Sequence, residues 1–128
     1  MEVSLGAESK VPTERVVTVV DCDRVVSPAT VEARVQGGTL FDLSATLFGN
    51  ITIKGGRIEQ SSFHDCRVLR MNETPVMETH ILPSTEAPTG IGEISTVLIT
   101  PALLNAVHGA TGQRIRELPL SSSSIGLA

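Results

Sequence analysis

The chain has 128 residues, a formal net charge of −4 at pH 7 and 41% hydrophobic residues, but aromatic residues make up only 2% of it. This length predicts one domain that can bury a core without disulfides, and that core must be built mainly from Val, Ile, Leu and Ala. The acidic balance and the scarcity of aromatic rings argue against nucleic-acid binding, which requires a basic surface and often stacking platforms.

The N-terminal part of the chain predicts a flexible lead-in, a strand and a long helix. Residues 1–13 are polar and loosely patterned, which is typical of a frayed terminus. Residues 15–22 form a β-branched run that predicts a buried strand. Ser27 and Pro28 then favour the start of a helix, because a serine caps free amides and a proline suits the first helical position. This helix is expected to end at Gly49.

The middle of the chain predicts more strands and a long loop. Residues 50–60 alternate around the pair Gly55-Gly56, which is typical of a β-hairpin. After a polar connection, residues 76–82 alternate again and predict a strand. Residues 83–92 contain several prolines and glycines, and they therefore predict an irregular loop.

The C-terminal part predicts a second helix, a short strand and a tail. Thr100 and Pro101 favour the start of the helix, and Gly112 closes it. Residues 115–120 are expected to form the last strand. The Ser-rich residues 121–128 lack a periodic apolar face, and they predict a flexible tail.

Together these elements predict an α+β fold. The order is strand, helix, three strands, helix and strand, which favours a mixed β-sheet with two helices packed on one face. Residues 14–120 are expected to form this single domain. The pattern indicates neither a second domain nor an internal repeat.

One carboxylate has a setting that is typical of a catalytic group. Glu93 follows Gly90 and Gly92 on the irregular loop, and such glycines let a backbone approach a bound group closely. An acid held this way is a candidate general base, although a lone loop glutamate is more often simply solvated. The pair Gly37-Gly38 inside the first helix indicates either a close helix contact or a backbone that another group approaches.

The histidines and cysteines give weaker signals. His64, His80 and His108 could each act as an acid–base group or a metal ligand, but a structural role is the simpler interpretation of each. Cys22 and Cys66 lie far apart and match no metal-binding spacing, which indicates two reduced, partly buried thiols. No stretch reaches the roughly 18 apolar residues of a membrane span, and the N-terminus lacks a signal-peptide pattern. The sequence therefore predicts a cytoplasmic protein.

The chain contains the two motifs FHDxxVLRMNExP and GxGE…PALxNA. Their combination is more specific than either motif alone, and it carries a resemblance to a known family over about residues 14–120. The chain is similar to the C-terminal part of the molybdenum-binding large subunit of the xanthine oxidase/aldehyde oxidoreductase family, with the isoquinoline 1-oxidoreductase beta subunit as the nearest branch.

The resemblance implies oxidoreductase chemistry. Members of the family hydroxylate aldehydes or N-heteroarenes with a molybdopterin cofactor, take the oxygen from water, and pass electrons to iron–sulfur clusters on a separate subunit or domain. It implies that Glu93 is the general base that deprotonates the molybdenum-bound hydroxyl, with Gly90 and Gly92 beside the cofactor. A metal lowers the pKa of such a hydroxyl, so one nearby carboxylate suffices to take the proton.

The sequence departs from the family pattern at two places. The family usually has Gln-Val-Glu-Gly-Gly in its first helix, where the Gln touches the pterin, but here the helix has Arg34 before Gly37 and Gly38. Arg34 cannot reproduce the accepting bond of an amide, though it could meet a phosphate. The family also usually has proline after the glutamate, whereas Ile94 stands there in this chain.

The chain is also short for the family and contains no cysteine set for iron–sulfur clusters. We therefore expect a truncated domain: a fragment or split piece of a molybdenum hydroxylase that supplies the general-base glutamate but is not active alone. Molybdopterin would bind only in a complete assembly, with the remainder of the large subunit and an iron–sulfur subunit as partners. The alternative is a non-catalytic remnant that acts as a binding or oligomerisation module, and its exposed surfaces could drive homo-oligomer formation.

Overall fold

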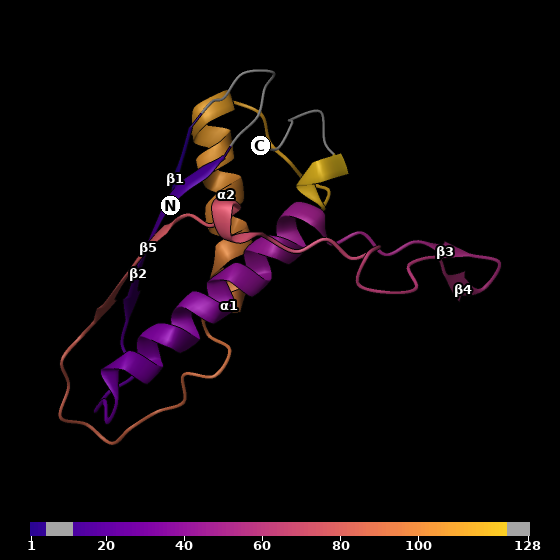
Figure 1. Cartoon of the computed structure of the whole chain (residues 1–128). Coiled ribbons are helices and arrows are strands. Elements are labelled where there is room, and N and C mark those ends of the chain that lie inside the picture. Colours follow the sequence, from indigo (N-terminus) through magenta and orange to yellow (C-terminus); the bar gives the residue numbers. More distant parts are fainter. Residues whose placement is uncertain (5–11, 123–128) are drawn as a thin grey trace.

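The computed structural model describes residues 1–4 and 12–122 (Figure 1). Its two long helices and a three-stranded sheet form the body, and a small hairpin lies apart from them. No helix of the described ranges has both the length and the apolarity to cross a membrane. The elements are β1 (Glu2–Val3), β2 (Thr13–Val20), α1 (Pro28–Phe48), β3 (Ile53–Lys54), β4 (Arg57–Ile58), β5 (Val76–Ile81) and α2 (Thr96–Thr111), with short 3₁₀ helices at Met71–Glu73 and Leu120–Ser122.

The main sheet is mixed, which confirms the predicted α+β class. Its strand order is β1-β2-β5; β1 is antiparallel to β2 and β5 is parallel to it. Val16 and Val20 of β2 project from one face of the sheet and pack against residues of the helices. Both helices therefore cover the same face, and α1 also contacts α2.

The first strand lies where the sequence predicts a flexible lead-in. Glu2 and Val3 pair with β2, and the Arg15 guanidinium lies 2.8 Å from a Glu2 carboxylate oxygen. Val3 also packs against the core. A strand of two residues carries too little pattern to be recognised without its partner strand. Residues 5–11 of the predicted lead-in lie outside the described residues, and its last residue, Thr13, begins β2.

β2 is buried on one face only, so the prediction of a buried strand is correct for that face and wrong for the other. Val16 and Val20 are buried, whereas Val17 and Val19 are exposed on the opposite face. Side chains of a strand alternate between faces, and the helices lie on one side of this sheet. A continuous β-branched run could not reveal that no described element covers the other side.

α1 has the predicted ends, but α2 begins one turn earlier than predicted. Pro101 lies inside α2, not at its start. The Asp42 carboxylate on α1 accepts hydrogen bonds from the Thr100 amide and hydroxyl, both at 2.9 Å. This contact with α1 stabilises the turn around the proline, where one intrahelical donor is missing. The helix can therefore extend back to Thr96.

The predicted last strand is also wrong. Residues 115–119 form no strand, and a 3₁₀ helix follows at Leu120–Ser122. Leu120 is buried in the same core cluster as Leu43 and Leu103. Pro119 has no amide N–H to donate to a neighbouring strand, which disfavours a strand here. The burial of Leu120 in the core determines the path of this segment instead. The rest of the predicted tail, residues 123–128, lies outside the described part of the chain.

The hairpin has the predicted turn. Gly55 and Gly56 both have positive φ, 58° and 75°, as a two-residue hairpin turn requires. Cys66, which follows the hairpin, is exposed, and Cys22 is buried. Both thiols are free, but the prediction of partial burial is wrong for Cys66.

Candidate functional site

Glu93 lies at the bend between the irregular loop and α2. Its carbonyl oxygen accepts hydrogen bonds from the Thr96 amide at 3.1 Å and the Thr96 hydroxyl at 2.7 Å. Its side chain is exposed, and no described residue bonds to its carboxylate. The backbone of Glu93 is therefore fixed by the start of the helix, while its carboxylate is free to meet a ligand or a proton.

The loop before Glu93 is attached to the body at several points. Ile91 packs against a small core cluster from β2, its following turn and α1. The Thr89 amide lies 3.5 Å from the Cys22 carbonyl oxygen, and the Arg24 guanidinium donates to the Thr85 carbonyl at 2.6 Å. The loop is irregular, as predicted, but these contacts hold it along one end of the body. The members of that cluster are Val20, Cys22, Val31 and Val35.

Gly38 brings α1 into direct contact with the start of α2. A Cβ atom at Gly38 would lie 2.1 Å from the Ser95 hydroxyl oxygen and 3.3 Å from the Ser95 Cβ. Ser95 is only 4% exposed and lies two residues after Glu93. Of the two interpretations open for this glycine, the structure shows the close helix contact. That contact helps to set the position of Glu93 relative to α1.

The other predicted site residues leave open space around them. A Cβ atom at Gly37, Gly90 or Gly92 would meet no atom within 4 Å, and none of these glycines has a positive φ. Arg34 is exposed, and its guanidinium has no partner in the described ranges. The N-terminal half of α1 and the loop thus carry a free cation, a free carboxylate and accessible backbone. Their roles toward a cofactor remain predictions.

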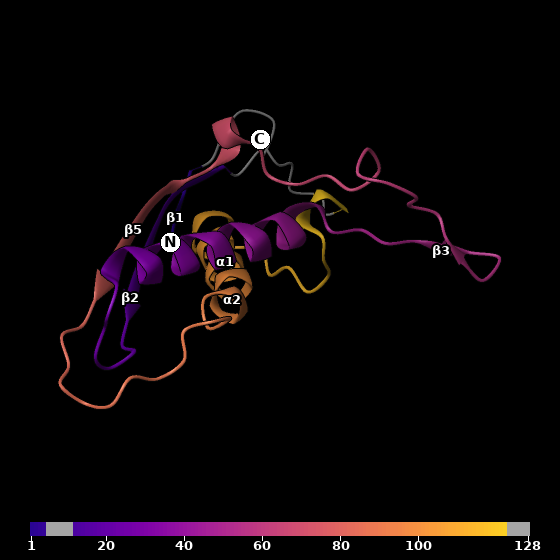
Figure 2. The same ribbon diagram turned by 60° about the horizontal axis from the view of Figure 1, so that its bottom comes forward.

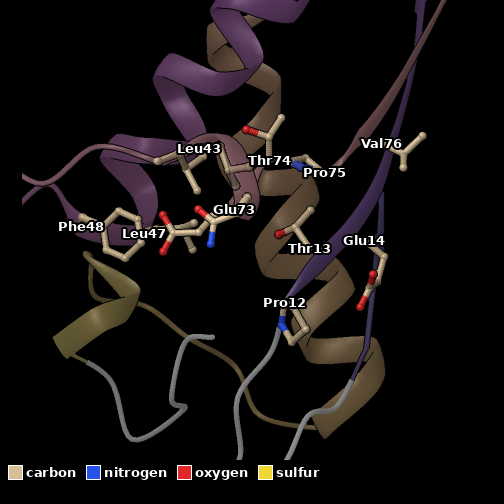
Figure 3. Close-up of a pocket in the computed structure, with 12 residues that line it drawn as sticks. Pro12, Thr13, Glu14, Leu43, Leu47, Phe48, Glu73, Thr74, Pro75 and Val76 are labelled. Atoms are coloured by element: carbon tan, nitrogen blue, oxygen red, sulfur yellow. The ribbon is translucent and has the colours of Figure 1, made fainter.

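A cavity of about 430 Å³ lies near the opposite end of α1 (Figure 3). The Thr13 hydroxyl oxygen is buried without a hydrogen-bond partner in the described structure. None of the predicted site residues lines this cavity, which sequence reasoning missed because three distant segments form it. Its lining residues are Pro12, Thr13, Glu14, Leu43, Leu47, Phe48, Leu69, Asn72, Glu73, Thr74, Pro75 and Val76.

Glu73 is the charged residue most strongly held at this cavity. It accepts a hydrogen bond from the Arg70 amide at 2.9 Å and forms an ion pair with Arg67. The Arg67 guanidinium lies 3.9 Å from the centre of the Phe48 ring. The backbone bond from Arg70, followed by the interaction with Arg67, lowers the pKa of the Glu73 carboxyl.

This lowered pKa predicts a local loss of structure in acid. A group with a depressed folded-state pKa stabilises the fold fully above its unfolded pKa, and it loses this effect as the pH falls through the folded value. We expect the protection factor of the Arg70 amide against hydrogen exchange to fall below about pH 4.3, the usual value for Glu, and Glu73→Gln to weaken this dependence. Glu86→Gln is the matched control, and an equal response in both variants would contradict the assignment.

The histidines do not gather at the predicted site. His64 lies 2.9 Å from the Asp65 carboxylate on an exposed segment, and His80 lies 3.8 Å from Glu78 on the sheet. His108 Nδ1 is buried without a hydrogen-bond partner among the residues described. Within the same ranges, no three His, Cys, Asp or Glu side chains form a group that could hold a metal ion.

Comparisons with known proteins place most of this chain in one group. A family model described as the molybdopterin cofactor-binding domain matches residues 3–75. A membrane-bound aldehyde dehydrogenase named for pyrroloquinoline quinone, from Gluconacetobacter polyoxogenes, is 35% identical over 90% of this chain. The isoquinoline 1-oxidoreductase subunit beta of Brevundimonas diminuta is 32% identical over 89% of it.

The chain spans about 15% of the length of both relatives. Among solved structures, quinoline 2-oxidoreductase from Pseudomonas putida 86 has the same fold, with a TM-score of 0.78 and 17% identity over 89% of this chain and 16% of that one. The family match includes Arg34, Gly37 and Gly38 but stops before Glu93. The alignments with the two relatives are long enough to include Glu93.

Proposed function

Because the chain belongs to the molybdopterin cofactor-binding domain family of the molybdenum-binding subunits, we propose that it is one part of a molybdenum hydroxylase. Such an enzyme hydroxylates an aldehyde or an N-heteroarene with oxygen from water. In this proposal the chain supplies the general base and is not active alone. The observation that supports it most directly is that the Glu93 carboxylate has no partner among the described residues, while Ser95, two residues later, contacts Gly38 in the stretch of α1 that the family match includes.

The free groups of α1 and of the loop before Glu93 fit one side of an anionic cofactor such as molybdopterin. The Arg34 guanidinium has no partner in the part of the chain that is described, so it is available for a phosphate oxygen. Gly37, Gly90 and Gly92 leave backbone that a bound group can approach closely. When bound, the cofactor would supply the centre that takes two electrons from the substrate.

Glu93 would take the proton of the hydroxyl group that acts as the nucleophile toward the substrate. Its carboxylate already faces open space, and the hydrogen bonds to its carbonyl oxygen fix where the side chain starts. In the chain alone this carboxylate is exposed to water, whereas general-base catalysis requires the proton of the nucleophile within hydrogen-bond reach. The remainder of the subunit would therefore have to cover the loop and bring the cofactor and the substrate to it.

The proposal predicts molybdenum and turnover only in a complete assembly. The test is to purify the chain alone, and then together with the remainder of its molybdenum-binding subunit and the iron–sulfur subunit. Molybdenum content and dye reduction are measured with an aldehyde and with a quinoline-type substrate. We expect about one molybdenum per assembly and turnover with one substrate class, and neither in the chain alone. An assembly without metal and turnover would refute the proposal.

A non-catalytic binding module is the second candidate function. Arg34 stands where the resemblance implies a cofactor-binding glutamine, and the chain exposes many large apolar side chains outside the loop. A stable assembly that contains no molybdenum would favour this alternative. A molybdenum-loaded assembly that turns over substrate would exclude it.

A further inference from the structure

Residues 50–68 form an arm that extends away from the body. Figures 1 and 2 show it leaving the end of α1 and carrying the β3–β4 hairpin near its far end. Almost all of its residues are exposed, and β3 pairs only with β4 within the described structure. A two-stranded hairpin of this size has little stability of its own in water. The arm therefore needs a partner surface to be stable in the shape observed.

The polar groups of the arm bond to one another. Gln60 accepts a hydrogen bond from the Thr52 amide at 2.8 Å and donates one to the Thr52 hydroxyl oxygen at 2.9 Å. The same hydroxyl donates to Glu59 at 2.7 Å, and Asp65 accepts two bonds from Ser61, both at 3.0 Å. These groups are already satisfied, so burying this part of the arm against a partner would leave few unpaired polar atoms.

The apolar groups of the arm face solvent instead. Ile53 is 73% exposed, Ile58 is 59% exposed, and Phe63 is 96% exposed. Ile53 and Ile58 are directly paired across the hairpin, so they offer one joint surface. An exposed apolar pair of this kind, together with an exposed Phe63 on the same arm, is typical of an interaction site.

The root of the arm is fixed to the body. The Leu69 amide donates to the Ser44 hydroxyl at 3.1 Å, and Arg67 lies over the Phe48 ring while it pairs with Glu73. The C-terminal end of the arm is thus attached to α1 and to the 3₁₀ helix that contains Glu73. This preorganisation lowers the entropic cost of docking.

We propose that the arm docks onto the remainder of the molybdenum-binding subunit and buries Ile53, Ile58 and Phe63 there; this inference rests on the proposed function. The arm lies inside the family match of residues 3–75. The relatives carry this region within chains of which it is only about 15%. Lys54 and Arg57 at the tip form no ion pair within the described ranges, so the surface that receives them is apolar with an acidic rim.

The natural thiols give a direct test. Exposed Cys66 lies on the arm and buried Cys22 lies in the body, so a maleimide probe labels the first and spares the second in the chain alone. In the assembly with the remainder of the subunit, we expect Cys66 labelling to slow roughly tenfold or more, since a docked arm excludes the reagent. The variant I53D/I58D is expected to weaken binding of the chain to the remainder by roughly tenfold or more.

Val26→Asp is the matched control, because Val26 is 89% exposed but lies outside the arm. It should bind as the unchanged chain does, and all variants should show the same thermal midpoint, since the arm lies outside the core. Unchanged Cys66 labelling, or equal binding by I53D/I58D, would overturn the inference even if the assembly is active. Protection of Cys66 by self-association alone would also overturn it, because a second copy would then cover the arm. An arm-dependent assembly without molybdenum would instead count against the proposed function only.

Discussion

Glu93→Gln is expected to lower turnover of the complete assembly by about two to four orders of magnitude, the usual contribution of a general base. The amide keeps the size of the side chain but cannot take up a proton. The carboxylate has no hydrogen-bond partner in the described structure, so its replacement should leave folding, assembly and molybdenum content unchanged. Turnover, metal content and thermal midpoint are measured on the same preparation.

Glu86→Gln provides the control from the same loop. Glu86 is exposed and precedes the glycines that flank the proposed base, so its replacement should leave turnover unchanged. Glu93→Gln with undiminished turnover would remove Glu93 from the mechanism. A loss of molybdenum in that variant would assign Glu93 to cofactor binding instead of proton transfer.

The elements that were correctly predicted are those with local signals at their ends. Pro28 begins α1 and Gly49 follows its end, since a fixed φ and a terminal glycine act within a few residues of themselves. The predicted capping by Ser27 is wrong, because its hydroxyl bonds to the Thr30 hydroxyl and caps no backbone amide. The pair Gly55-Gly56 likewise determines the hairpin through its own backbone. These signals need no tertiary contact to be effective.

The errors arise where a distant contact decides the structure. α2 extends past Pro101 because Asp42, which is far away in sequence, bonds to Thr100. The last segment buries Leu120 in the core in place of forming a strand. β1 exists because β2 offers it an edge. Propensity cannot anticipate such contacts, since each one exists only after the chain has folded.

The candidate site was predictable only where local signals in the sequence mark it. The prolines and glycines before Glu93 identify the loop, and Gly37-Gly38 indicates a close approach without saying which partner is involved. The structure supplies Ser95 as the neighbour of Gly38. The cavity at the other end of α1 could not be foreseen, because β2, α1 and the segment before β5 meet only in three dimensions.

Gly38→Val is expected to lower the free energy of unfolding by about 1–3 kcal/mol, the usual cost of an overpacked contact. Even the first added carbon would lie 2.1 Å from the Ser95 hydroxyl and 3.3 Å from the Ser95 Cβ. Rotating the hydroxyl relieves only the first of these contacts, so the start of α2 must move away from α1. The small gain in helix propensity, a few tenths of a kcal/mol, is too weak to offset this. Urea denaturation measures the difference.

Gly37→Val separates this contact from any general effect of replacing a helical glycine. A side chain at Gly37 meets open space, so this variant should match or slightly exceed the stability of the unchanged chain. Ser95→Gly combined with Gly38→Val should recover part of the loss, because the two sites touch and their effects are therefore not additive. Equal losses at both glycines would contradict the assigned contact. Since Glu93 lies two residues before Ser95, Gly38→Val should also lower turnover of the assembly under conditions where the assembly remains folded. Gly37→Val tests a separate question, which is whether a cofactor approaches the open side of α1.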